Sequence, residues 1–210
     1  MYSQKVAVTI PVTSKQQFAE DSKRAISQGA TFIEARVDFY KGEISDLVGT
    51  MRKISSKLIV TLRPRSQNGK FEGGTDERVE ALMMVERKVE PFRIDIEHDI
   101  MDHFKGNLFR RLVSWHDFAS TPSMKRMIGL FMEMREHGDI VKIVPTPKNV
   151  EEAKRIIKLY QHLEGGNLIA FGMGKYGRSS RVECVSHENG APFTYASLSG
   201  AIAPGQYTLG

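Results

Sequence analysis

The sequence predicts an α/β protein that forms one (β/α)8 barrel domain over residues 1–210. Eight short runs rich in β-branched and aromatic residues recur along the chain, and segments with apolar residues at helical spacing separate several of them. Polar side chains fall at the ends of consecutive runs, where a barrel of this kind builds its active site. An open doubly wound sheet is the alternative arrangement of the same elements.

The predicted strands are short and regularly spaced. They cover residues 5–10, 31–37, 57–62, 92–96, 111–115, 140–144, 167–171 and 193–198. Between them, apolar residues recur at spacings of three and four over residues 44–54, 124–131 and 150–160, which predicts amphipathic helices. Eight strands that alternate with helices in 210 residues are close to the minimum for the barrel.

Capping signals predict where these helices begin and end. Ser14 with Gln17, and Asn149 with Glu152, have the spacing of a capping box. Thr121 before Pro122 predicts an N-cap followed by a proline at the first helical position. The C-terminal stops are predicted at Gly29 and at the pair of glycines at positions 165 and 166.

Composition excludes several classes of protein. A net charge of +5 is spread over the chain and interleaved with 25 acidic residues, so no basic arm or stripe for nucleic acid is visible, and a small anionic substrate fits this mild excess equally well. Cys184 is the only cysteine, which excludes an internal disulfide and a cysteine metal cluster. The sequence contains no run long enough for a membrane span and no secretory leader, so we expect a cytoplasmic protein.

Lys142 is the first candidate for the chemistry because it interrupts the apolar run Asp139-Ile140-Val141-Lys142-Ile143-Val144. Burial disfavours a charged amine, and a neutral lysine is a nucleophile that forms imines with carbonyl substrates. An ordinary lysine pKa of about 10.4 leaves almost no neutral amine at pH 7. We expect burial, with Arg36 and Arg63 nearby, to lower this pKa, although the acidic residues of the site oppose that shift.

Other polar residues stand at the ends of the second to sixth predicted strands. They are Glu34, Arg36, Asp38, Arg63, Asp95, Glu97, His116 and Lys142. Because alternate side chains share one face of a strand, one cluster at the mouth of the barrel would hold them. Simpler interpretations exist for each. Lys142 could be a snorkelling lysine, Glu34, Arg36 and Asp38 could form a structural ion-pair ladder, and His116 could be a hydrogen-bonded histidine at the end of a strand. The acids and histidines at positions 97–103 lack the helical His pair of a metal site, so we expect no metal.

Seven short motifs follow one another along the chain. They are Glu34-Ala35-Arg36-Val37-Asp38, Thr61-Leu62-Arg63, Glu72-Gly73-Gly74, Ser114-Trp115-His116-Asp117-Phe118 with Thr121-Pro122, Asp139-Ile140-Val141-Lys142, Gly177-Arg178-Ser179-Ser180-Arg181 and Ala203-Pro204-Gly205-Gln206. Each motif is weak alone, but seven in order are specific, and together they resemble those of the type I 3-dehydroquinate dehydratase family. The resemblance runs from about residue 5 to residue 206.

The resemblance implies a (β/α)8 barrel that dehydrates 3-dehydroquinate in the shikimate pathway without a metal or cofactor. Lys142 would form a Schiff base with the ring ketone, and His116 would be the general acid and base. Glu72, from the loop after the third strand, would stand near His116 and orient it. Glu34, Arg36 and Arg63 would bind the hydroxyl side of the ring. Arg181 and Gln206 would hold the carboxylate, for which a guanidinium fork is well suited.

The sequence departs from the family pattern in three places. Ile202 stands where many members have a serine, so one hydroxyl contact to the substrate is either missing or supplied by Ser197, Ser199 or Thr208. The chain ends at Gly210, which predicts a minimal barrel with a truncated C-terminal helix, and we expect a partner subunit of a homodimer to cover the bare wall. Nothing before the first strand predicts a hairpin that closes the barrel floor. The glycine-rich loop over residues 64–75 is predicted to be a mobile lid that carries Glu72.

Two other functions keep parts of this interpretation. An aldolase acting on a sugar phosphate would also use Lys142, but it should have a phosphate site after the seventh and eighth strands. A basic scaffold that binds nucleic acid would need neither Lys142 nor His116, and its binding would be sensitive to salt. The acids and arginines at the strand ends favour a hydroxylated carboxylate ring over both.

Overall fold

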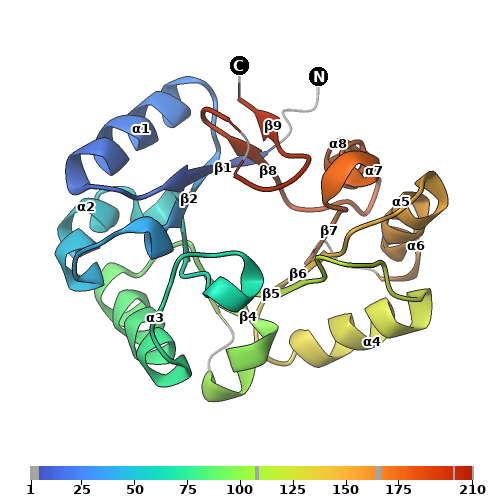
Figure 1. Cartoon of the computed structure of the whole chain (residues 1–210), viewed down its shortest axis with the longest axis horizontal. Coiled ribbons are helices and arrows are strands. Elements are labelled where there is room, and N and C mark those ends of the chain that lie inside the picture. Colours follow the sequence, from blue (N-terminus) through green and yellow to red (C-terminus); the bar gives the residue numbers. More distant parts are fainter. Residues whose placement is uncertain (1–4, 107–108, 164–166, 201, 210) are drawn as a thin grey trace.

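The fold is a curled sheet of parallel strands surrounded by helices, as Figure 1 shows. The computed structural model describes residues 5–106, 109–163, 167–200 and 202–209. The strands are β1 (Val6–Pro11), β2 (Phe32–Arg36), β3 (Leu58–Thr61), β4 (Arg93–Glu97), β5 (Arg111–His116), β6 (Ile140–Val144), β7 (Leu168–Ala170), β8 (Thr194–Ser197) and β9 (Tyr207–Thr208). Each of the eight predicted strands therefore forms, and β9 was not predicted.

The order of the strands is that of the predicted barrel. Hydrogen-bonded neighbours run β7-β6-β5-β4-β3-β2-β1-β8-β9, and all the ladders are parallel. The described residues include no ladder between β7 and β8, where the rings of Phe171 and Tyr195 lie 6.1 Å apart instead. Consecutive parallel strands with crossover helices exclude the doubly wound alternative, because the strand order never reverses direction at a central switch point.

The α-helices cover the outside of the sheet. They are α1 (Lys15–Ser27), α2 (Val48–Arg52), α3 (Thr75–Val89), α4 (Met124–Met134), α5 (Val150–Ile157), α6 (Leu159–His162), α7 (Gly174–Gly177) and α8 (Ser180–Ser186). Short 3₁₀ turns cover Val37–Phe39, Ile44–Leu47, Ser55–Lys57, Arg65–Gln67 and His98–His103. The predicted helix over residues 44–54 is therefore α2 with the 3₁₀ turn before it. After β8 the described residues form β9 and no helix.

Most predicted helix boundaries are confirmed. The Ser14 and Asn149 side chains cap α1 and α5, and Gly29 follows α1 with a φ of +96°. The boundary predicted at Thr121 and Pro122 is wrong, because α4 begins at Met124 and Ser123 accepts the capping hydrogen bond from the amide of Arg126. The glycines at positions 165 and 166 lie outside the described residues.

An aromatic cluster fills the end of the barrel at which the strands begin. The rings of Phe32 and Phe92 stack at 4.3 Å, and Phe193 packs against Phe32 at 5.0 Å. These residues open or precede β2, β4 and β8. The barrel floor is thus packed by side chains of the strands themselves, which leaves the opposite end for a binding site.

Candidate active site

The C-terminal ends of the strands surround one cavity, and most of the predicted site residues line it. Its lining includes Glu34, Arg36, Arg63, His116, Lys142, Arg181 and Gln206, which are seven of the eight residues predicted for catalysis and substrate binding. Glu72 is not among the described residues that line it. The charges that the sequence separates along the chain are therefore brought together at the mouth of the barrel, as strand alternation predicted.

Lys142 lies in the middle of β6 with only 5% of its surface exposed. Its Nζ is 3.1 Å from Oδ2 of Asp95, 3.9 Å from Oε1 of Glu34 and 4.4 Å from the centroid of the Tyr195 ring. The arginines expected beside this lysine are not its contacts: it touches carboxylates and an aromatic face instead.

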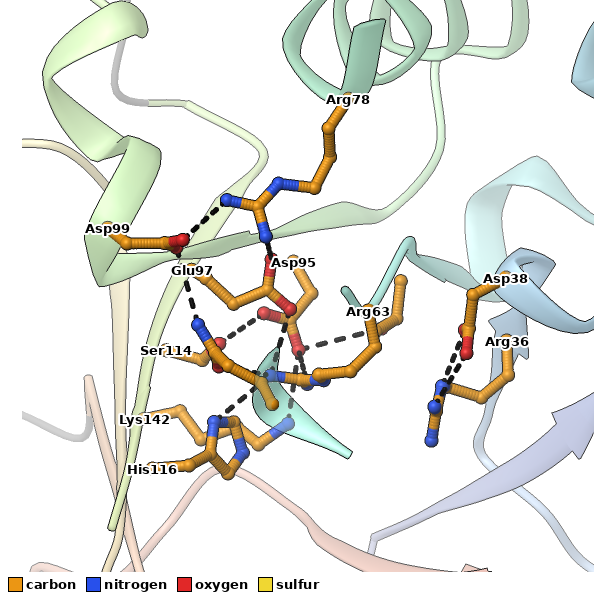
Figure 2. A network of polar contacts seen from close by, with 12 residues as sticks. Arg36, Asp38, Arg63, Arg78, Asp95, Glu97, Asp99, Ser114, His116 and Lys142 are labelled. Atoms are coloured by element: carbon orange, nitrogen blue, oxygen red, sulfur yellow. Dashed lines mark hydrogen bonds and ion pairs between the residues drawn. The ribbon is translucent and has the colours of Figure 1, made fainter. Parts of the chain in front are cut away.

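Asp95, on β4, is the centre of a network of polar contacts, which Figure 2 shows. It accepts hydrogen bonds from Lys142 Nζ, from Arg63 Nη2 at 3.2 Å and from the Ser114 hydroxyl. Burial alone would raise the pKa of Asp95, but the charges of Lys142 and Arg63 and the bond from Ser114 hold it below the ordinary value. Asp95 is therefore a permanent anion that fixes the position of the lysine.

His116 ends β5 and faces the cavity beside Phe118, whose ring stacks at 6.0 Å. Its Nδ1 lies 3.0 Å from Nη1 of Arg63. Burial and the cationic side chains around it, first among them Arg63 and then Lys142, hold the pKa of His116 well below 6.5. The imidazole is therefore neutral at pH 7.

Arg63 connects His116 with two buried carboxylates of β4. Its guanidinium forms ion pairs with Glu97 at 2.9 Å and with Asp95 at 3.2 Å. Burial would lower the pKa of Arg63, but these carboxylates raise it above its ordinary value, so the side chain is a permanent cation. For the carboxyl group of Glu97, burial raises the pKa to about 7, and the charge of Arg63 opposes this shift. Arg78 of α3 approaches Glu97 from the other side at 3.7 Å (Figure 2).

Arg36 is held by a carboxylate that follows it in the sequence. Its Nε and Nη2 each donate to one oxygen of Asp38 at 2.8 Å, and both residues are buried. The string Glu34-x-Arg36-x-Asp38 is thus partly an ion pair, but Arg36 still lines the cavity. Because Asp38 already fixes the guanidinium of Arg36, little further side-chain entropy is lost when this guanidinium binds a ligand.

The loop over residues 64–75, which was predicted to be a lid, is held to the barrel by hydrogen bonds over its first half. Lys70 donates its amide to Asp38 at 3.0 Å, and the Gln67 amide reaches Asp99 at 3.3 Å. The turn closes tightly on Arg63, since a Cβ on Gly69 would lie 2.0 Å from the Arg63 carbonyl oxygen. Gln67 and Asn68 line the cavity from this loop, and neither was predicted as a site residue.

Glu72 lies further along the same loop and away from His116. Its side chain is 60% exposed and forms an ion pair with Arg65. The contact found at Nδ1 of His116 is Arg63, not a carboxylate. The orienting role expected for Glu72 has no contact to support it in this arrangement, and it stays a prediction.

Arg181 and Gln206 reach the cavity from the last third of the chain. The Arg181 guanidinium lies 4.3 Å above the Phe171 ring and donates to the Pro204 carbonyl at 3.3 Å. Among the described residues it has no ion pair, its Nε has no hydrogen-bond partner, and burial lowers its pKa to about 10. A buried guanidinium without a carboxylate partner, in a cavity wall, is the feature of a site that receives an anion.

Gln206 is oriented from both ends of its side chain. Its Oε1 accepts from the amides of Ile202 and Ala203 at 3.2 Å, and its Nε2 donates to Thr9 at 3.0 Å. Ile202 lines the cavity where the family pattern has serine. Ser197, one of the residues expected to replace that hydroxyl, donates instead to the carbonyl of Tyr207 at 3.2 Å.

Three further residues of the site were not predicted. Thr9 and Thr61 donate to the two oxygens of Glu34 at 2.7 and 2.9 Å, and Tyr195 lies beneath Lys142. Thr9 is paired with Glu34 in the β1–β2 register, so strand alternation applied to β1 would have found it. Tyr195 had no signal, because an aromatic residue in a strand is most often part of the core.

The run of acids and histidines after β4 is used for ion pairs. Asp99 binds Arg78 at 2.7 Å, and His98 contacts Glu133 at 3.1 Å. Within the described residues, no three histidine, cysteine or acidic side chains gather as metal ligands would. None of the described helices is long and apolar enough to cross a membrane.

Comparisons with known proteins give one consistent family. The sequence model of a family described as type I 3-dehydroquinase matches residues 6–210. The chain is 31% identical over 207 residues to the 3-dehydroquinate dehydratase of Methanothermobacter thermautotrophicus, covering 95% of this chain and 90% of that protein. It is 34% identical over 201 residues to the 3-dehydroquinate dehydratase of Pyrococcus abyssi, covering 91% and 90%.

Solved structures with the same name share the fold. The 3-dehydroquinate dehydratase of Aquifex aeolicus superposes with a TM-score of 0.79 at 26% identity, covering 98% of this chain and 94% of that one. The protein of the same name from Geobacillus kaustophilus gives a TM-score of 0.85 at 18% identity, covering 98% and 86%. The second likeness concerns the barrel alone.

Proposed function

Because the chain belongs to the type I 3-dehydroquinase family, we propose that it dehydrates 3-dehydroquinate to 3-dehydroshikimate through an imine on Lys142, with His116 as general acid and base. Such an enzyme is a carbon–oxygen hydro-lyase. The observation that carries the proposal is that Lys142, a buried lysine, opens into the same cavity as His116 and Arg181, whose guanidinium has no carboxylate partner among the described residues. Amine, acid/base group and anion receptor are the three parts that this chemistry needs.

The proposed steps balance without a cofactor. The Lys142 amine adds to the ring ketone, and the resulting carbinolamine loses water to give an iminium. His116 takes a proton from the adjacent carbon, and the electron pair moves to the iminium nitrogen to give an enamine. The enamine expels the neighbouring hydroxyl group, which His116 protonates so that it leaves as water. Water then hydrolyses the new iminium, which returns Lys142 and releases the enone.

Asp95 supports the reacting amine from behind. It holds the lysine nitrogen in place through the 3.1 Å contact. Arg63 lies 3.0 Å from the imidazole of His116, so the acid/base group stands beside the amine in the same cavity. Positioning of two reacting groups in one closed site accounts for a large part of the rate of such reactions.

The substrate's polar groups match the remaining cavity wall. Glu34, Arg36 and Arg63 are proposed to bind the ring hydroxyls, and Arg181 and Gln206 the carboxylate. Arg36 and Gln206 are each fixed by partners that leave donors free, since Asp38 occupies only part of the Arg36 fork and Thr9 only one N–H of Gln206. A single domain, a homodimer and a cytoplasmic location stay predictions.

Reduction with borohydride tests the imine directly. The protein is mixed with 3-dehydroquinate, treated with borohydride and digested, and the peptides are weighed by mass spectrometry. We expect a stable adduct on the peptide that contains Lys142, because hydride converts the iminium to a secondary amine. Turnover without any trapped adduct would refute the imine, and absence of both turnover and adduct would refute the dehydratase.

Replacing Arg181 tests the carboxylate site. We expect Arg181→Gln to raise KM by about 10- to 100-fold, because a charge-assisted hydrogen bond contributes about 1.5–3 kcal/mol. The matched control is Arg178→Gln, since Arg178 packs on Tyr207 and does not line the cavity. Steady-state kinetics measures both, and an unchanged KM in Arg181→Gln would remove Arg181 from the substrate site.

A further inference from the structure

The contact between Arg63 and His116 determines which ring nitrogen carries the proton. Arginine has N–H donors and no acceptor, and it stays protonated in proteins. Its Nη1 lies 3.0 Å from Nδ1 of His116, so Nδ1 must offer its lone pair. The imidazole is neutral in this environment, as its lowered pKa indicates. The proton of the unliganded histidine therefore sits on Nε2.

This tautomer does not suit the proposed chemistry. To take a proton from carbon, Nε2 must have a free lone pair, which requires the ring proton to be on Nδ1. To give up its present proton, the ring would have to become an imidazolate anion. A histidine capped by arginine at Nδ1 is therefore a hydrogen-bond donor that is neither an effective base nor an effective acid.

We propose that Arg63 is a positioning residue that locks His116 in the inactive Nε2–H tautomer, and that bound substrate releases the lock by drawing the guanidinium away. This inference rests on the proposed function for its substrate, but the resting tautomer follows from the Arg63 contact alone. Once Arg63 leaves, Nδ1 carries the proton and Nε2 faces the substrate as a base. Proton abstraction would then begin only in a filled site.

Glu97 holds the lock in place. Its Oε1 forms an ion pair at 2.9 Å with Nη1 of Arg63, the same nitrogen that meets the histidine. Glu97 itself is fully buried, and within the described part of the chain neither of its oxygens accepts a hydrogen bond. Its contribution is therefore the negative charge of its ionised form, which draws Nη1 to this position. Figure 2 shows the chain of contacts from Arg78 through Glu97 to Arg63 and His116.

The location of Glu72 is consistent with the same switch. A carboxylate only accepts hydrogen bonds, so Glu72 can orient His116 only when Nδ1 carries the proton. Arg63 and Glu72 are thus mutually exclusive partners of Nδ1. In this arrangement Arg63 occupies Nδ1, and Glu72 is outside the cavity on Arg65.

Nitrogen NMR of the full-length protein labelled with ¹⁵N-histidine tests the lock. His116→Gln identifies the His116 signals by their loss. In the unliganded wild type we expect Nδ1 in the unprotonated range and Nε2 in the protonated range. For the filled site, Lys142→Met is used with and without 3-dehydroquinate, because a variant without the amine cannot form the iminium and turn the substrate over. We expect the proton to move to Nδ1 when substrate binds.

Opposite outcomes overturn the proposal. An Nδ1–H tautomer in the unliganded wild type would refute the lock, and an Nε2–H tautomer that persists in the saturated Lys142→Met complex would refute its release. Failure of 3-dehydroquinate to bind would count against the proposed function, and the resting tautomer would still be measured.

Glu97→Gln keeps the shape of the side chain and removes its charge. We expect a mixture of the two tautomers in this unliganded variant, because Nη1 is no longer held at the histidine. Asp99→Asn is the matched control, since it removes a charge on the far side of Arg78 and should keep the wild-type tautomer. A pure Nε2–H tautomer in Glu97→Gln would refute the role assigned to Glu97.

Discussion

Replacement of Lys142 by methionine is expected to lower kcat on 3-dehydroquinate by on the order of 10⁵-fold, the size of loss seen when an enzyme loses its nucleophile. Without the amine no iminium forms, so the proton next to the ketone loses its electron sink. Methionine fills most of the volume of lysine, and Asp95 keeps its contacts with Arg63 and Ser114, so the variant should fold. Production of the enone, followed by its absorbance, measures the rate.

The matched control for this substitution is Lys154→Met. Lys154 lies on the surface of α5 in an ion pair with Glu151 and does not line the cavity. We expect wild-type kcat from it. A Lys142→Met enzyme within tenfold of the wild-type kcat would rule out an imine at this position.

His116→Gln is expected to lower kcat by about 10²- to 10⁴-fold, the usual contribution of a general acid and base. The imine can still form slowly without it, so borohydride should trap an adduct on Lys142 in an enzyme that scarcely turns over. This combination of a trapped adduct with slow release of product separates the role of His116 from that of Lys142. If the variant showed neither an adduct nor turnover, this would indicate that it has lost the structure of its site and not only its base.

The pH profile gives a second readout for His116. The neutral imidazole is the working form, and its pKa in the free enzyme is held well below 6.5. The value of kcat/KM should therefore fall only as the pH drops well below 6.5, and His116→Gln should not show this acidic limb. His98→Gln is the control, because His98 pairs with Glu133 outside the cavity.

The positions of the strands and most of the site could be predicted because each depends on local pattern. A buried parallel strand appears in the sequence as a short apolar run, so a charged residue such as Lys142 is conspicuous within that run. The exceptions show where local pattern is insufficient. The start of α4 was misplaced because Ser123, like Thr121, has a hydroxyl that can cap a helix, and the sequence did not show that Ser123 forms the cap.

The surroundings of Lys142 show a second limit. The sequence placed arginines and acids at neighbouring strand ends, but it did not say which would touch the lysine. The β-sheet register and side-chain length decide this: Asp95 and Glu34 reach Lys142, whereas Arg63 turns to Glu97 and His116. The expected neighbours were therefore in the site but not in contact.

The sequence by itself determined the barrel, the order of its strands and the group of residues at its mouth, because strand periodicity and the parallel βα connection leave few other solutions. Only the tertiary structure decided the pairing within that group. Arg63 could have bound substrate alone, yet it caps Nδ1 of His116 and is held by Glu97. Such pairings depend on the distances between side chains that are far apart in sequence, which the fold sets. Because an unpaired buried charge is unfavourable, each charge pairs with whichever opposite charge the fold brings within reach.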